Sequence, residues 1–177
     1  MYAEIYARCI DVRQLGDGRL GLLVAQVIAR TGCDLTALGR TDAKLAILAE
    51  RGILTARTDS PEVLNKLLAH PADVVVEVTG SPDGFALARL LVRPGGILAL
   101  KSTFARSLPA FDISSLVVDE ITLVGSRCGP FAPAIRLLAE GAVDVASLIH
   151  ARYSLDDGLA ALEHASQRGV LKVLVGG

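Results

Sequence analysis

A glycine-rich turn between an apolar segment and a helical segment constrains this 177-residue chain more than any other feature. The turn consists of Gly16, Asp17, Gly18, Arg19, Leu20 and Gly21. It follows a candidate strand at 10–15, and it opens a segment at 22–30 whose apolar residues recur at helical spacing. In such a turn the first Gly permits the tight bend, the second lets the backbone approach a ligand, and the third lets helix and strand pack closely. The spacing therefore predicts a strand–turn–helix unit whose helix N-terminus binds phosphate groups.

Short apolar runs alternate with longer amphipathic segments along most of the chain, which is typical of repeated βα units and a parallel sheet. The candidate strands of this sheet are 10–15, 34–38, 53–56, 73–78, 96–100 and 121–125. The candidate helices are 22–30, 41–51, a segment that starts at Ser60-Pro61, and 81 to about 93. We therefore expect an α/β fold with a Rossmann-type, doubly wound parallel sheet that binds a dinucleotide.

A second pattern begins at about Val143, where a short strand (149–153), a helix (155–167) and another short strand (171–175) follow one another. This pattern is typical of an appendage to the six-stranded unit rather than of another layer of it. We expect a dinucleotide-binding domain at 1–145 and a short C-terminal appendage at 146–177.

Composition limits the partners of the chain. Hydrophobic residues make up 51% and charged residues 21% of the sequence, and the formal net charge is −1 with dispersed basic residues. Neither nucleic acid nor a membrane surface is an expected partner. Because no signal peptide or bilayer-spanning run is recognisable, we expect a cytoplasmic location. Cys9, Cys33 and Cys128 lie far apart without metal-ligand spacing, so we expect ordinary buried or half-buried thiols.

The residue at the end of the second strand bears on the choice of cofactor. An acidic residue about 20 positions after the glycine motif hydrogen-bonds the adenosine ribose of NAD. Here that position is Arg40, flanked by Gly39 and Thr41. A guanidinium can pair with a 2′-phosphate, so Arg40 favours NADP over NAD. A solvated Arg at a strand end is the alternative, and Asp42 leaves NAD open.

The first candidate strand has an unusual sequence for the centre of a parallel sheet, because it contains Asp11 and Arg13. Unpaired charges in a strand that is covered on both faces would cost several kcal/mol. The two side chains could pair with each other or with neighbours, or the strand could be shifted or frayed. We take the charges as a hint that the chain begins at an unnatural boundary, such as that of a truncated gene.

Several motifs together resemble one known family. They are the turn 16–21, the run 73–81 (Asp-Val-Val-Val-Glu-Val-Thr-Gly-Ser), Arg93-Pro94-Gly95-Gly96, the run 119–126 and the closing Lys172-Val173-Leu174-Val175. In this order they resemble the cofactor-binding and C-terminal part of the medium-chain dehydrogenase/reductases, the zinc-dependent alcohol dehydrogenase superfamily. The resemblance extends from about Gly16 to the end of the chain.

The resemblance implies a sheet of order 3-2-1-4-5-6 with the cofactor across the carboxyl ends of its strands. Residues after the fourth strand would line the nicotinamide ribose, and residues after the fifth and sixth strands would approach the nicotinamide. The first set is Val78, Thr79 and Gly80, and the second is Lys101, Ser102, Gly125 and Ser126. A simple turn at Thr79-Gly80 and a solvated Lys101 are the alternatives.

Family members also have a separate catalytic domain that supplies the zinc ligands, and no such set is recognisable here. His70, His150 and His164 are isolated, so we expect no zinc in this chain and no catalytic residue of its own. The appendage 146–177 would complete the catalytic domain in the family. Its apolar strands, and the edge strand 121–125 through which family dimers pair, predict a homodimer.

Three functions remain open at this stage. The first is the NAD(P)-binding domain of an alcohol dehydrogenase-like oxidoreductase. The second is a non-catalytic NAD(P)-binding sensor or interaction module. The third is a remnant that binds nothing, because Asp17 places a negative charge near the pyrophosphate unless its side chain points to solvent.

Overall fold

The computed structural model describes residues 10–104 and 112–176. The chain divides into two compact units, residues 1–130 and 131–177, and each is described by itself. The expected functional division after residue 145 stays a prediction. Cys9 lies outside the described residues.

A six-stranded parallel sheet forms the first unit. Its strands, in the order of the sheet, are β3 (Leu54–Arg57), β2 (Asp34–Gly39), β1 (Asp11–Leu15), β4 (Ala72–Glu77), β5 (Val92–Leu100) and β6 (Thr122–Gly125). This is the order 3-2-1-4-5-6, so the predicted doubly wound topology is confirmed. The chain changes direction across the sheet at β1, which lies between β2 and β4.

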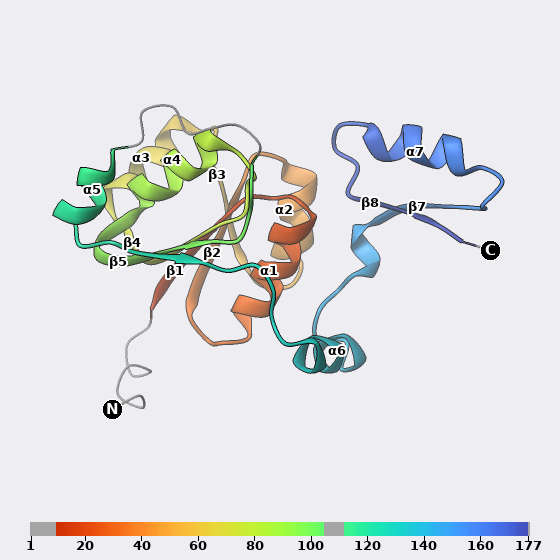
Figure 1. Ribbon diagram of the computed structural model, residues 1–177, viewed down its shortest axis with the longest axis horizontal. Helices are drawn as coiled ribbons and strands as arrows, with labels where there is room; N and C mark the ends of the chain where they lie inside the picture. The colour runs from red at the N-terminus through yellow and green to blue at the C-terminus, as the bar shows by residue number, and fades with distance from the viewer. Residues whose placement is uncertain (1–9, 105–111, 177) are drawn as a thin grey trace. The chain divides into compact units, whose positions relative to one another are not determined.

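Helices cover both faces of this sheet (Figure 1). They are α1 (Arg19–Ala29), α2 (Asp42–Ala49), α3 (Pro61–Ala69), α4 (Pro82–Leu91) and α5 (Ile113–Val118). Helices α1 and α2 contact each other, as do α3 and α4 on the other side. The core lies between the sheet and α4, where Leu15, Leu38, Val75 and Leu98 are buried, one from each of four strands. Burial of these apolar side chains is the main stabilising contribution to such a fold.

Strand β1 is regular despite its charges. It pairs with β2 along its whole length and with β4 from Val12 onward. Arg13 is 4% exposed, and its guanidinium donates hydrogen bonds to the backbone oxygens of Leu67 (2.6 Å) and His70 at the C-terminus of α3. Asp11 lies 3.6 Å from it. Of the two alternatives for these charges, pairing with each other and with neighbours is therefore confirmed, and a shifted or frayed strand is not found, because helix carbonyls and Asp11 satisfy the buried charge.

In the first unit, two segments differ from the sequence-based expectation. Helix α4 ends at Leu91 rather than near Arg93, and β5 begins at once at Val92. The ring of Pro94 disfavours helical backbone at the residue before it, so the chain is already extended there. Helix α5 was not expected; its N-cap Asp112 accepts a hydrogen bond from the Ser114 N–H (2.9 Å), as capping side chains do.

The second unit contains α6 (Phe131–Ala139), a 3-10 turn η2 (Ala146–Leu148), β7 (Ile149–Tyr153), α7 (Gly158–Ser166) and β8 (Lys172–Val175). Strands β7 and β8 form a parallel pair, and α7 connects them. The predicted strand–helix–strand pattern is thus confirmed, whereas α6 was not expected. In α7, Leu159 and Leu162 are exposed.

No helix in residues 10–104 and 112–176 combines the length and apolar character needed to cross a membrane. Of the cysteines, Cys33 is half-buried as expected, whereas Cys128 is exposed, because it follows β6 in a segment whose residues all face solvent. Both are free thiols.

Candidate functional site

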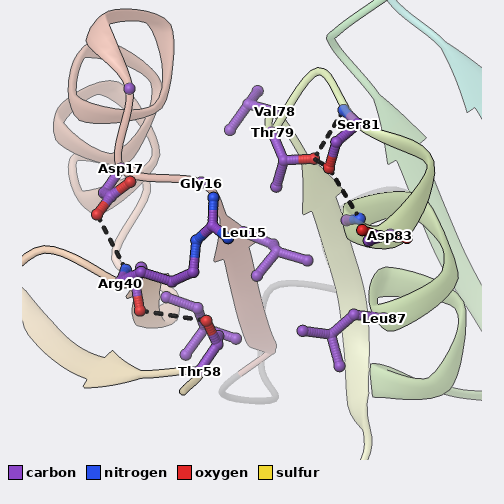
Figure 2. A pocket seen from close by; sticks show the side chains of 14 residues that line it. Leu15, Gly16, Asp17, Arg40, Thr58, Val78, Thr79, Ser81, Asp83 and Leu87 are labelled. Atoms are coloured by element: carbon purple, nitrogen blue, oxygen red, sulfur yellow. Dashed lines mark hydrogen bonds between the residues drawn. The ribbon is translucent and has the colours of Figure 1, made fainter. Parts of the chain in front are cut away.

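A cleft of about 460 Å³ opens at the carboxyl ends of β1, β2 and β4, where the strand order reverses (Figure 2). It is lined by Leu15, Gly16, Asp17, Gly18, Leu38, Gly39, Arg40, Thr58, Val78, Thr79, Ser81, Asp83, Gly84 and Leu87. Ligands of open α/β sheets bind at such a reversal point, and the volume is in the range of small-molecule sites. The fold therefore brings the glycine turn to the place where a ligand is expected.

The glycine turn packs tightly on its neighbours. Gly16 has a φ of 131°, and a Cβ there would lie 2.9 Å from the backbone of Val78. The Gly16 N–H donates to the oxygen of Leu38 (2.8 Å), which ties the turn to β2. At Gly21 a Cβ would lie 1.9 Å from the Gly16 oxygen. Both positions require glycine, because backbone atoms occupy the space of a side chain.

Gln14, in strand β1, supports the turn through its side chain, a role that sequence reasoning missed. Its side chain is fully buried in β1, and its Nε2 donates to the Gly16 oxygen (2.6 Å). Among the described residues no partner reaches its Oε1. A neutral polar residue in a central strand was the available signal, but the sequence does not show to which atom its amide points.

Gly18 has a different environment from the other two glycines of the motif. It is the N-cap of α1 with an ordinary extended backbone, and no atom lies within 4 Å of where its Cβ would be. Helix α1 has no side-chain cap and no acidic residue in its first turn. Its N-terminal N–H groups and the positive end of its dipole fit a phosphate group that approaches over Gly18.

The side chain of Asp17 is turned toward the end of β2. Its Oδ2 accepts hydrogen bonds from the N–H groups of Arg40 (2.9 Å) and Thr41 (2.8 Å), directly after β2. Burial acts to raise the pKa of Asp17, but these two bonds, the Thr41 hydroxyl and the nearby charge of Lys44 together hold the pKa below its ordinary value. The carboxylate is therefore ionised at neutral pH and bridges the glycine turn and β2.

Arg40 extends its exposed side chain over the cleft toward Gly16 (Figure 2). Asp42, the alternative acidic residue, has another partner: its Oδ2 lies 2.5 Å from the Nη1 of Arg57. Arg57 also binds Asp59. The hydrogen bond to Asp59 and, as the next largest cause, that to Asp42 raise the pKa of Arg57. In turn, the hydrogen bond from Arg57 lowers the pKa of Asp59. Of the described residues that line this cleft, Arg40 alone has a basic side chain.

A buried carboxylate organises the ends of β4 and β5. Glu77 accepts hydrogen bonds from the N–H (2.6 Å) and hydroxyl (2.5 Å) of Thr79 and from the hydroxyl of Ser102 (2.5 Å). Ser102 in turn accepts from the N–H of Gly80 (2.9 Å). The turn after β4 and the turn after β5 are thus held together, although the sequence offered no sign that Glu77 connects them.

Two other expected site residues line a different cavity. Lys101 and Ser126, which lie 3.3 Å apart at their Nζ and Oγ atoms, border an apolar cavity of about 360 Å³. The remaining lining residues are Leu23, Val24, Val27 and Ile28 of α1, Val76 and Ala99. This face of α1 thus borders the cavity, while Leu22, Ala25 and Gln26 of the same helix are buried.

The structure separates the expected site residues into three groups. The main cleft brings together Gly16, Gly18, Gly39, Arg40, Val78 and Thr79. The apolar cavity contains Lys101 and Ser126. The third group lines neither the cleft nor the apolar cavity, and it consists of Arg19, Leu20, Gly21, Thr41, Gly80, Ser102 and Gly125. Four of these residues nevertheless support the residues that line the two spaces, namely Gly21, Thr41, Gly80 and Ser102. Sequence reasoning missed Thr58, Ser81, Asp83 and Leu87, which no spacing motif marks.

The described residues hold no group of three or more His, Cys, Asp or Glu side chains that could bind a metal ion. His164 and His150 have structural contacts instead. The Nδ1 of His164 lies 3.0 Å from the hydroxyl of Tyr153, and the Nδ1 of His150 accepts from the N–H of Leu171 (3.4 Å). His70 contributes its backbone oxygen to Arg13.

Comparison with known proteins identifies the family. The sequence profile described as zinc-binding dehydrogenase matches residues 20–140. The chain is 27% identical over 171 residues to a D-arabitol-phosphate dehydrogenase of Enterococcus avium, covering 91% of this chain and 49% of that protein. It is 29% identical over 170 residues to a sorbitol dehydrogenase of Halalkalibacterium halodurans, covering 90% and 50%.

Solved structures have the same fold. A zinc-binding dehydrogenase of Sinorhizobium meliloti, described as bound to NADP, superposes with a TM-score of 0.82 at 25% identity, covering 95% of this chain and 52% of that one. An alcohol dehydrogenase of Escherichia coli, described as complexed with NADH, superposes with a TM-score of 0.81 at 17% identity, covering 95% and 52%.

The chain spans about half the length of the curated relatives it matches. The residues that match the profile, 20–140, contain α1 from Leu20 onward and the strands β2 to β6 and begin at the end of the glycine turn. This chain therefore belongs to the zinc-binding dehydrogenase family and corresponds to the Rossmann-fold part of these alcohol dehydrogenase-like proteins.

Proposed function

We propose that the cleft binds NAD or NADP, with the pyrophosphate over Gly18 and the N-terminus of α1. The observation that supports this most directly is the open space at Gly18, since a glycine without a steric requirement of its own is explained by a ligand that approaches it. The uncapped helix supplies the N–H groups for the phosphates. Asp17 is held away from them at β2, which removes the main reason to regard the chain as a non-binding remnant.

The protein of which this fold is part acts, in our proposal, as an oxidoreductase on an alcohol and its carbonyl form. The named relatives are dehydrogenases of sugar alcohols or their phosphates, so a polyol is the proposed substrate class. The nicotinamide, when bound, supplies the hydride chemistry. The protein holds the cofactor across the strand ends, and the link from Glu77 to Ser102 fixes the two turns expected beside its nicotinamide half.

Arg40 supports a preference for NADP. Its exposed guanidinium extends over the cleft from the end of β2, where the adenosine ribose is expected. Asp42, which could have bound the ribose of NAD, is paired with Arg57. A guanidinium binds a 2′-phosphate in a bidentate manner, so we expect NADPH to bind more tightly than NADH.

Titration of the 177-residue chain with NADPH and NADH, followed by nicotinamide fluorescence and calorimetry, tests the proposal. The informative variant is Gly18→Val, which the open, extended backbone accommodates and which places a side chain where the pyrophosphate lies. Gly158→Val in the second unit is the matched control, since a Cβ there also meets nothing within 4 Å. We expect binding to wild type and to the control, and at least a tenfold loss in Gly18→Val.

Binding of neither nucleotide to wild type would contradict the proposal and favour a remnant. Equal affinity of Gly18→Val and wild type would place any bound nucleotide outside this cleft. Turnover of an alcohol by this chain alone would contradict our expectation that the catalytic zinc and most of the substrate pocket belong to a separate domain. Binding without any redox role in the complete protein would favour the sensor, an alternative that the match to dehydrogenases does not favour.

We also propose that the chain forms a homodimer, through β6 in the first instance. Strand β6 ends the sheet, and Leu123 and Val124 on it are exposed. Apolar edge strands are association surfaces. Light scattering at micromolar concentration should give a dimer for wild type and a monomer for Val124→Lys. A dimer that persists in this variant would favour the C-terminal appendage, and a monomeric wild type would contradict the proposal.

A further inference from the structure

The turn that is expected to hold the cofactor carries an acidic side chain whose position no motif predicts. Asp17 reaches out of the turn to the end of the neighbouring strand, where its Oδ2 binds the N–H groups of Arg40 and Thr41. Two successive N–H groups that point at one anion form the kind of site that elsewhere binds phosphate. Here a carboxylate of the chain itself occupies that site.

The end of β2 is built around this carboxylate. A Cβ on Gly39 would lie 2.7 Å from the Cβ and 2.9 Å from the Oδ2 of Asp17, so a larger residue at 39 would displace the Asp17 side chain. Gly39 is buried and has no positive φ that would by itself demand glycine. The absence of a side chain at position 39 is therefore explained by the space that Asp17 fills.

The location matters because the residue at the end of β2 contacts the adenosine ribose in dinucleotide-binding sheets, on its 2′-hydroxyl or 2′-phosphate. Arg40 is that residue, and the Asp17 Oδ2 is 2.9 Å from its backbone nitrogen. An ionised carboxylate bound to the backbone of this residue repels a 2′-phosphate that approaches the end of β2, because both groups are negatively charged. It does not repel a 2′-hydroxyl, which can donate a hydrogen bond to it.

We propose that Asp17 is a specificity-determining residue that selects against the 2′-phosphate of NADP, by occupying the N–H pair of Arg40 and Thr41 and by its charge. This inference rests on the proposed binding of a dinucleotide in the cleft. Cofactor preference is then the balance of two opposed residues on neighbouring turns. The guanidinium of Arg40 attracts the 2′-phosphate, and the carboxylate of Asp17 repels it.

The experiment measures the ratio of the Kd values for NADH and NADPH in wild type, Asp17→Asn, Asp17→Ala and Arg40→Ala. Asn keeps an oxygen for the two N–H groups and removes only the charge, whereas Ala also releases the N–H groups. We expect Asp17→Asn to shift the ratio about tenfold toward NADPH and Asp17→Ala to shift it further. Arg40→Ala should shift the ratio toward NADH.

A second pair of ligands restricts the measurement to the adenosine half. ADP and 2′,5′-ADP differ by the 2′-phosphate alone and lack the nicotinamide, so the Asp17 variants should shift their Kd ratio as they shift that of the complete cofactors. Thermal unfolding of each variant identifies any that fails to fold. Asp17→Asn, which retains the hydrogen-bond acceptor, then carries the test by itself.

The outcomes separate the two proposals. If wild type binds and the Asp17 variants lose or gain affinity for both nucleotides by the same factor, Asp17 has a purely structural role and the specificity inference is overturned while the proposed function stands. If neither nucleotide nor ADP binds to any variant, the proposed function fails, and the inference fails with it.

Discussion

Strands β1 and β6 have sequences that do not match their positions in the sheet, because the central strand is the more polar and the edge strand the more apolar of the two. Three of the residues of β1 are Asp11, Arg13 and Gln14, yet the strand lies at the centre of the sheet and is buried from Val12 onward. Strand β6 carries Leu123 and Val124, yet it ends the sheet and all its residues are exposed. The difference teaches that burial in this sheet follows from the neighbours of a strand rather than from its own apolar content.

Strand β1 tolerates its polar side chains because backbone oxygens of neighbouring elements lie within reach on both faces of the sheet. Arg13 points to the C-terminus of α3, where the last carbonyls of a helix lack partners within the helix. Gln14, one residue on, points to the opposite face and reaches the glycine turn. A charged residue in the centre of the sheet therefore completes the hydrogen bonding of neighbouring elements.

The first test of this difference in burial makes the same substitution, Leu to Ala, in both strands. Leu15→Ala, at a side chain that is 3% exposed, should lower the free energy of unfolding by about 3 kcal/mol. Leu123→Ala, at a side chain that is 44% exposed, should lower it by about 0.5 kcal/mol in the monomer. Urea denaturation of both variants measures the difference. Equal losses would mean that β6 is as well covered as β1.

A second prediction concerns the charge itself. Arg13→Met should lower the free energy of unfolding by about 2 kcal/mol, because the bonds from the buried guanidinium to the oxygens of Leu67 and His70 are lost, although the Leu67 oxygen keeps the N–H of His70. Lys66→Met is the control: its bond to Glu62 is almost fully exposed, so about 0.5 kcal/mol or less is expected. A stabilised Arg13→Met would show that an apolar central strand is preferred here after all.

A smaller effect is expected at Gln14. In Gln14→Leu the Gly16 oxygen loses its donor, but the Oε1 atom, which no described residue binds, is removed as well. The two changes oppose each other, so the free energy of unfolding should change by less than about 1 kcal/mol. The same denaturation series checks this. A loss as large as that of Arg13→Met would mean that the glycine turn depends on this amide for its stability.

The smallest effect is expected at Asp11 and depends on pH. Burial, together with the charges of Asp73 and Asp34, raises the pKa of Asp11, against the opposing effect of Arg13. The folded state therefore binds the Asp11 proton more tightly than the unfolded state, and ionised Asp11 costs stability. Because its side chain is 43% exposed, Asp11→Asn should gain only about 0.5 kcal/mol or less.

This gain should develop as the pH rises from the ordinary Asp pKa of 3.8 to the raised value in the folded state, and stay constant above it. Thermal unfolding of wild type and Asp11→Asn over this range measures it. A variant that is less stable than wild type at neutral pH would show that the attraction between Asp11 and Arg13 outweighs the burial of the carboxyl group.

The sheet could be predicted from sequence because its signals are local. The run 73–78 and the glycine spacing at 16–21 are read from neighbouring residues, and the strand order then followed from the resemblance to a family. The helices α5 and α6 were not predicted, because they lack such local signals. Helix α5 is short, and α6 contains Pro133 near its start, so neither presents a long periodic pattern.

The parts of the site that could not be predicted are contacts between residues far apart in the chain. The charge of Asp17 was evident, but not that it binds the N–H groups of Arg40 and Thr41, because side-chain direction depends on where two strands lie. Likewise Glu77 appeared as one position in an apolar run, whereas its bond to Ser102 joins two turns. Spacing motifs identify which segments meet, and they leave open which atoms bind.

The close contact between Gly39 and the side chain of Asp17 also limits how this chain can change by single mutations. Any side chain at position 39 collides with Asp17 as long as Asp17 keeps its place. An Asp17→Gly change, by contrast, is possible at once and makes room for Gly39→Ala afterwards. The two positions therefore have a preferred order of substitution, and a descendant with a larger residue at 39 should also have lost the acid at 17.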